Sequence, residues 1–274
     1  MSPAKRRSVV GLGLGLSAVF VLSVVLAAPS ASRASPGEGR SGVADPTALK
    51  ALARTAAYLR SLPGFKLHAT VTDDEVVHGD FKLQRSAEVH VLVRRPDRMR
   101  ADLSGDFGER LFVYDGKTFG IYLKNENYYG SIHARPTLRE TLAVVEQYSV
   151  DLPLVDIIFL AMGGKLDANV QDGGTIGTSR VAGVDCLQLA FRGDGVDWQL
   201  WLTVGAKPVP RKLVITTTDD PTRPQYTALM DWDVSSPVRS DDFSFQPPPS
   251  ARRMTFAVPE PRPATAAPAP DNAL

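Results

Sequence analysis

Apolar and polar residues alternate along several stretches of this chain. In the stretch from residue 196 to 202, Val196, Trp198, Leu200 and Leu202 fall on one side. The stretch from 226 to 234 repeats the pattern with Tyr226, Ala228, Met230, Trp232 and Val234. A period of two indicates antiparallel strands with one apolar and one solvated face. Because that apolar face carries two tryptophans, it must cover the protein's own helices or a bound molecule.

A long hairpin is predicted nearer the N-terminus. The apolar residues take the odd positions both in residues 65–71 and in residues 81–93. The two apolar faces coincide only if odd residues pair with odd residues, which centres the hairpin on Gly79. Paired residue numbers then sum to 158, and this register places His68 directly opposite His90 on the polar face.

Those two histidines are the weak metal candidates of the chain. Imidazoles on facing strands hold zinc or copper only with a third or fourth ligand, and the neighbours Glu88 and Thr70 make a poor set. Two partly exposed histidines that face each other are the commoner case. We therefore expect neither a metal nor another cofactor.

Arg85 interrupts the apolar face of the second strand of this hairpin. A charge there must find a partner, reach solvent or lie at the mouth of a cavity, because burial without a partner costs several kcal/mol. The pattern favours a local bulge or an edge position that turns the side chain outward.

The other predicted elements follow the same reasoning. Asp45-Pro46 starts a helix as N-cap and first helical residue, and Pro63-Gly64 ends it. A second helix is predicted over residues 137–148. A third, over residues 152–162, is almost wholly apolar but too short to span a membrane, as in a buried helix or a lid over an apolar pocket. Further strands are predicted at residues 98–103, 110–114, 118–123, 128–132, 175–181 and 184–191.

The ends of the chain differ in composition from its middle. Residues 1–34 combine a basic start, an apolar run and small residues before Ala34, which predicts a secretory signal peptide, with an uncleaved anchor as the alternative. Residues 35–45 predict a flexible linker and residues 46–249 a single domain. Residues 250–274 are rich in Pro and Ala and predict a disordered tail. The protein is therefore expected in the periplasm, or otherwise outside the cytoplasmic membrane, with no transmembrane segment after cleavage.

Charge and cysteine content narrow the class further. Four of the 31 basic residues and none of the 30 acidic residues lie before residue 35, so the mature chain has a net charge of −3. Without a long basic run, a nucleic-acid partner is not expected. The single cysteine, Cys186, cannot form an intramolecular disulfide and is predicted to be a small core residue.

The sequence shows no catalytic motif. A nucleophile elbow, a zinc-protease helix and a phosphate-binding glycine loop are all missing from it. The carboxylate pairs at residues 73–74, 219–220 and 241–242 stand where turns favour Asp. We therefore expect no enzyme. Carboxylates that converge in a polar cleft around Asp73 or Asp219 would instead indicate a hydrolase.

Several blocks of the sequence carry a family resemblance. GVDWQLWL, PVPRKLVIT and PQYTALMDWDV, preceded by LRSLPGFKLHATVT and LFVYDGKTFGIYLKNENYYG, resemble a bacterial family of predicted periplasmic proteins with no assigned function. The resemblance covers about residues 45–250. It implies an α+β fold similar to periplasmic lipoprotein carriers (LolA-like half-barrels): a strongly curved antiparallel sheet, or incomplete β-barrel, with helices packed against its concave face.

Pattern and resemblance together predict a function. The first hypothesis is a binding protein or carrier for a lipid, an acylated protein or another apolar ligand held in the concavity, without catalysis. The alternative is an interaction module of an envelope complex that docks on a protein partner through a sheet edge or the Pro-rich tail. The predicted apolar lining consists of Val89, Val91, Phe159, Trp198, Leu200, Tyr226, Met230 and Trp232.

Overall fold

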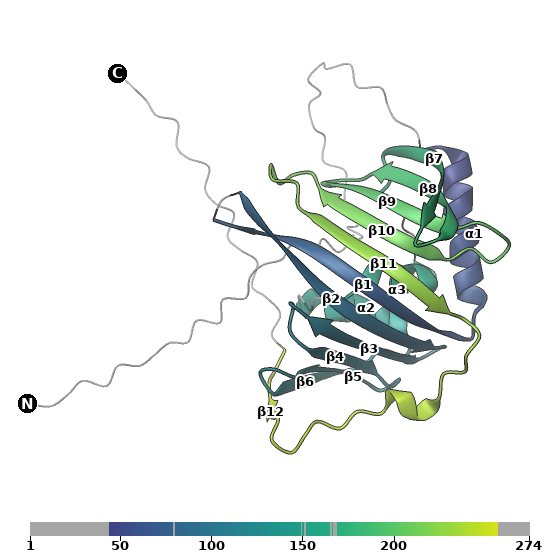
Figure 1. Cartoon of the computed structure of the whole chain (residues 1–274). Helices are drawn as coiled ribbons and strands as arrows, with labels where there is room; N and C mark the ends of the chain where they lie inside the picture. The colour runs from purple at the N-terminus through teal and green to yellow at the C-terminus, as the bar shows by residue number, and fades with distance from the viewer. Residues whose placement is uncertain are drawn as a thin grey trace, which may run out of the picture.

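The structure, a computed structural model, describes residues 44–78, 80–148, 150, 152–164, 166 and 169–256. The predicted signal peptide, most of the predicted linker and residues 257–274 lie outside this part of the chain. Within it, twelve strands form one sheet in the order β12-β6-β5-β4-β3-β2-β1-β11-β10-β9-β8-β7. Figure 1 shows the sheet as a continuous, curved layer.

The strands match the predicted alternating stretches closely. Their bounds are β1 (Gly64–Val77), β2 (Phe81–Arg94), β3 (Arg98–Gly105), β4 (Arg110–Tyr114), β5 (Thr118–Leu123), β6 (Tyr128–His133), β7 (Asp172–Val181), β8 (Val184–Arg192), β9 (Val196–Thr203), β10 (Pro210–Thr217), β11 (Gln225–Asp233) and β12 (Arg252–Arg253).

Two consecutive series of antiparallel strands build this sheet. Strands β1 to β6 form the first series and β7 to β11 the second, and the antiparallel pair β1–β11 joins them. In the β1–β2 hairpin, Gly64 lies opposite Arg94 and His68 opposite His90. All paired numbers in it sum to 158, so the predicted register is confirmed.

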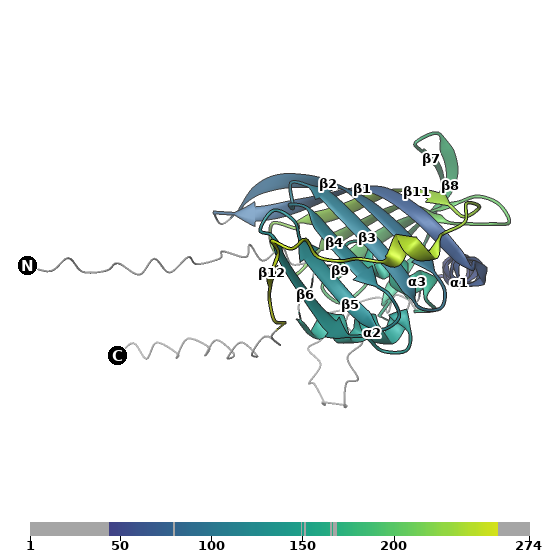
Figure 2. The ribbon, with the colours of Figure 1, turned by 90° about the horizontal axis from the view of Figure 1, so that it is seen from below.

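In the described part of the chain, three α-helices accompany the sheet: α1 (Pro46–Ser61), α2 (Leu138–Val145) and α3 (Val155–Ala161). The 3-10 turn η1 (Glu146–Tyr148) follows α2, and a second one, η2 (Ser240–Phe243), lies after β11. The carboxylate of Asp45 accepts a hydrogen bond of 2.8 Å from the Thr47 amide, which confirms the predicted N-cap. Figure 2 shows α2 and α3 on the inner side of the curved sheet, and α1 contacts β7 and α3.

The main core lies between this inner face and the helices. Fully buried side chains meet there from β1 (Phe65, Leu67), from β4 (Phe112) and from α3 (Ile157, Ile158). The prediction of an α+β fold, a curved antiparallel sheet with helices against its concave face, is confirmed.

A small second cluster lies on the opposite face of the sheet. Trp201 packs there with Val181, Cys186 and Val214, and its indole donates a 3.0 Å hydrogen bond to Ser179 Oγ. Cys186 is buried, as predicted, and burial raises the pKa of its thiol. A buried thiol with a raised pKa is a packing residue and not a reactive one.

The C-terminal end of the body continues past the predicted domain limit at residue 249. Strand β12 pairs in parallel with β6, and the Met254 amide donates a 2.7 Å hydrogen bond to the Tyr129 carbonyl. The Phe256 ring lies 5.6 Å from the ring of Tyr148. Residues 250–256 are therefore part of the folded body, although they were predicted to belong to the tail.

A candidate ligand cavity at one end of the sheet

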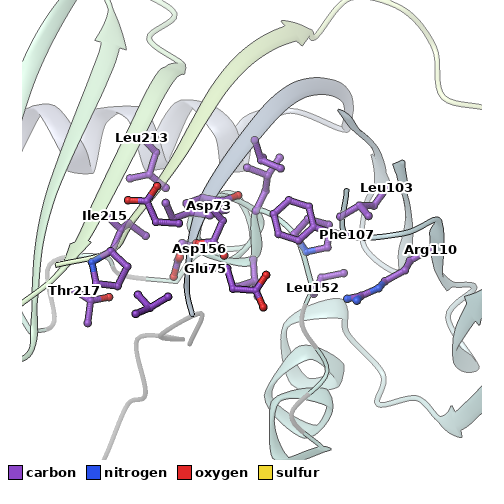
Figure 3. A pocket seen from close by; sticks show the side chains of 18 of the residues that line it. Asp73, Glu75, Leu103, Phe107, Arg110, Leu152, Asp156, Leu213, Ile215 and Thr217 are labelled. Atoms are coloured by element: carbon purple, nitrogen blue, oxygen red, sulfur yellow. The ribbon is translucent and has the colours of Figure 1, made fainter. Parts of the chain in front are cut away.

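A cavity of about 130 Å³ opens where the helices stop covering the inner face of the sheet. Strands β1, β10 and β11 form one wall, the β3–β4 turn another, and the segment before α3 closes it (Figure 3). The lining residues are Val71, Asp73, Asp74, Glu75, Val76, Leu103, Phe107, Arg110, Leu152, Pro153, Leu154, Val155, Asp156, Leu213, Ile215, Thr217, Asp220, Pro224 and Tyr226.

The cavity has an apolar floor and an apolar lid. Val71, Leu103 and Leu213 are buried core residues that also reach the cavity, so the floor is continuous with the main core. Leu152 and Leu154, just before α3, are buried on the lid side. This combination suits an apolar group that enters from solvent and displaces weakly held water.

Leu154 holds the lid in an unusual conformation. It precedes the first residue of α3 with φ 57° and ψ 25°, in the left-handed region, and its side chain makes no capping hydrogen bond. This region costs a non-glycine residue about 1–2 kcal/mol. Burial of the leucine side chain over the cavity offsets that cost.

Charged side chains line the cavity beside its apolar floor. Carboxylates come from Asp73, Asp74, Glu75, Asp156 and Asp220. Asp74 forms a 3.3 Å ion pair with Lys82. Asp220 accepts 2.8 and 2.7 Å hydrogen bonds from the amide and the hydroxyl of Thr222, and these bonds lower the pKa of the Asp220 carboxyl.

Arg85 stands beside this cavity and faces the inner side of the sheet. The β1–β2 register runs through Arg85 without a shift, so the expected bulge that would turn it outward is absent from this pair. Its guanidinium lies 3.2 Å from the Glu75 carboxylate and 4.7 Å from the centre of the Phe107 ring. Arg85 is therefore paired beside a cavity, whereas the sequence pattern favoured a side chain turned outward by a bulge or an edge position.

Of the eight residues predicted to line a pocket, Tyr226 lies in this cavity. The other seven pack in the main core or at its border, away from the described cavity: Val89, Val91, Leu200 and Met230 are fully buried, Trp198 stacks on Phe191, Trp232 packs on Phe65, and Phe159 contacts Gly164. No bound ligand tests the lining, so these seven remain a prediction.

Sequence reasoning missed most of the residues that line this cavity. Phe107 belongs to the β3–β4 turn, Arg110 is the first residue of β4, and Asp220 and Pro224 belong to the β10–β11 turn. Turn residues carry no period that points to a face. The usable signals were charges: Asp156 inside the almost wholly apolar stretch 152–162, Asp73 as a possible cleft carboxylate, and Arg85 on the apolar face beside the cavity.

The predicted histidine pair lies on the outer face of the sheet. The rings of His68 and His90 stack with their centres 4.5 Å apart, and His68 Nε2 lies 2.7 Å from a Glu88 carboxylate oxygen. Among the residues that the structure describes, no group of three or more His, Cys, Asp or Glu side chains could hold a metal ion. Nor is any helix in these residues long and apolar enough to cross a membrane.

Comparisons with known proteins identify a family. The model of the family described as predicted periplasmic protein (DUF2092) matches residues 48–257. No curated protein matches the sequence significantly.

Solved structures of similar shape exist at low sequence identity. An uncharacterized conserved protein from Thermus thermophilus is 14% identical over 76% of this chain and 99% of its own, with a TM-score of 0.46. Mycobacterium tuberculosis lipoprotein LppX is 12% identical over 72% and 100%, with a TM-score of 0.45. A LolA superfamily protein from Nitrosomonas europaea is 7% identical over 72% and 98%, with a TM-score of 0.35. Similarities this distant carry no functional argument.

Proposed function

The chain belongs to the DUF2092 family of predicted periplasmic proteins, and we propose that it works there as a non-catalytic binding protein or carrier for an apolar ligand. The ligand class is a lipid, the acyl chain of an acylated protein or a comparable apolar molecule. The observation that supports this proposal is the cavity that continues the apolar core to the surface under the lid residues Leu152 and Leu154.

The size of the cavity sets how much of a ligand it takes. A dry protein cavity of about 150 Å³ binds benzene, so the 130 Å³ cavity accepts a group of similar size. Burial gains about 0.8 kcal/mol per methylene, or about 5 kcal/mol for six carbons. The end of an acyl chain or a single ring fits, and the rest of a larger ligand lies outside.

Native mass spectrometry of residues 35–274, purified from a bacterial envelope, tests this proposal. We expect a co-purifying apolar molecule that is released on denaturation. Ile215 of β10 lines the cavity, so Ile215→Trp fills it and should abolish the bound mass. Val204→Trp places the same indole at an exposed turn and should leave the bound mass unchanged. A clean apo mass that does not change on incubation with fatty acids or phospholipids would contradict the proposal.

The carboxylates at the cavity favour a second candidate, a hydrolase, because they converge around Asp73 as such an enzyme requires. A general acid needs a raised pKa, whereas the pKa of Asp220 is lowered, and Asp74 and Glu75 form ion pairs. Asp74, Glu75 and Asp220 are therefore poorly suited to act as a general acid. The same mass spectra distinguish the carrier from the hydrolase. After prolonged incubation, the ligand released from a carrier has its original mass, whereas a hydrolase releases fragments.

A further inference from the structure

The polar part of the cavity lining is acidic. Its carboxylates come from separate parts of the chain: Asp73 and Glu75 from β1, Asp156 from α3 and Asp220 from the β10–β11 turn. Figure 3 shows the first three between the β10 side of the cavity and the β3–β4 turn. Because the apolar floor holds a group of only about six carbons, the remainder of a larger ligand lies next to these carboxylates.

Two of these carboxylates lie where a strand normally carries apolar side chains. Val71, Asp73 and Glu75 occupy alternate positions of β1, so they share its inner face. The preference of Asp for turns accounts for Asp220 but not for a carboxylate within a strand. The inner face of β1 therefore changes from apolar to acidic within the cavity itself.

Cations do not balance the acidic lining. Among the described residues that line the cavity, Arg110 is the one cation against five carboxylates. Two further cations stand beside it, Lys82 in the ion pair with Asp74 and Arg85 in the ion pair with Glu75. Five carboxylates against three cations leave two net negative charges. This excess is the same whichever carboxylate Arg110 faces.

Asp220 contributes a lasting part of this negative charge. Its hydrogen-bond partners, the hydroxyl and the amide of Thr222, are neutral, and they lower the pKa of the Asp220 carboxyl. The carboxyl is therefore ionised at neutral pH. Arg223 of the same turn lies 3.3 Å from the carboxylate of Asp197 and pairs there instead.

Aromatic side chains line the same cavity. The guanidinium of Arg85 lies 4.7 Å from the centre of the Phe107 ring, so this ring already faces a cation. Tyr226 lies directly opposite Asp73 in the β1–β11 register, which places a second ring beside a carboxylate. Aromatic faces attract ammonium groups and carboxylates pair with them, whereas an anion gains from neither.

We propose that the cavity selects an apolar ligand with a cationic head, such as an alkyl chain that ends in an ammonium group. This inference rests on the proposed carrier function and specifies the ligand class. The alkyl end occupies the floor formed by Val71, Leu103 and Leu213, and the ammonium group lies among the carboxylates. A ligand with the same chain but a carboxylate head meets like charges there and binds more weakly.

Calorimetric titration of residues 35–274 with three octyl probes tests the proposal. Octylammonium, 1-octanol and octanoate share one chain, and at neutral pH their heads are cationic, neutral and anionic. Octylammonium should bind at least tenfold more tightly than octanoate, with octanol between them. If octanol binds but octylammonium binds no more tightly than octanoate, the charge selection is overturned and the carrier function stands. If none of the three probes binds, both are overturned.

A matched pair of variants locates the effect in the cavity. Asp220→Asn removes one charge but keeps an oxygen that accepts from the Thr222 amide, so the turn is retained. It should weaken octylammonium binding about threefold and leave octanol binding unchanged. Asp241→Asn removes an exposed carboxylate in η2, near Arg94 at the other end of β2, and should change neither. Equal weakening by both variants would mean that the probe follows the overall charge of the protein, and would overturn the proposal.

Discussion

At the scale of single residues, Arg95 connects the ends of α1 and α3 through hydrogen bonds. Its guanidinium donates to the Leu62 carbonyl at 2.8 Å, to the Leu59 carbonyl at 3.1 Å and to the Ala161 carbonyl. These carbonyls lie at the C-terminal ends of α1 and α3, where a cation is favoured; the Leu59 carbonyl also accepts a 3.3 Å hydrogen bond from the Leu62 amide. Burial lowers the pKa of Arg95, followed by repulsion from Arg60, but a guanidinium stays charged in proteins.

Replacing Arg95 by Met should therefore destabilise the fold. The apolar stem remains, but the buried carbonyls lose a charged donor, which costs about 3 kcal/mol of the free energy of unfolding. Urea denaturation followed by circular dichroism measures this change. Arg54→Met on the exposed side of α1 is the control, with an expected effect within about 0.5 kcal/mol. Equal effects of the two substitutions would contradict this role of Arg95.

At the scale of elements, α3, whose first residues line the cavity, is expected to be less stable than α1. It has seven residues and starts from left-handed Leu154 without a side-chain cap, whereas α1 has sixteen residues and the Asp45 cap. Short, uncapped helices depend on packing, since nucleation of a helix is unfavourable. Hydrogen exchange with mass spectrometry should show faster exchange in α3 than in α1. An apolar ligand should slow exchange in α3 only. Equal protection of α1 and α3 without ligand would contradict the lower stability of α3.

The elements also show what the sequence could predict. Period-two alternation sets which face a residue occupies, so the hairpin register and most strand bounds are confirmed. It does not tell where along a strand the helices stop. Leu200 and Met230 pack in the covered part, while the cavity reaches Val71 of β1 and Ile215 of β10, which lies directly opposite Trp198. The sequence therefore predicts which residues face the inner side of the sheet. Which of them line the cavity depends on where the segment before α3 lies, and the alternation does not show this.

At the scale of the whole molecule, one pair of strands joins the two halves of the sheet, β1–β6 and β7–β11. The β1–β11 pair links strands far apart in the chain, and neither it nor the parallel β12–β6 pair is visible in local patterns. Both halves nevertheless contribute to one continuous core, from Phe112 of β4 to Leu200 of β9. A continuous core favours unfolding in a single step even in a body of this size.

Met230 tests this coupling because it lies at the joint, fully buried and opposite Ala69. Truncation by Met230→Ala removes core contacts and should lower the free energy of unfolding by about 2–5 kcal/mol. Trp198 and Trp201 lie in β9, so in a Trp232→Phe background tryptophan fluorescence reports on the C-terminal half; the replacement is needed because Trp232 packs on Phe65 of β1 at the joint. Hydrogen exchange in β3 to β5 reports on the other. If the sheet is one cooperative unit, both probes report the same decrease in the free energy of unfolding of the variant. If the two halves unfold independently, the decrease appears mainly in the fluorescence.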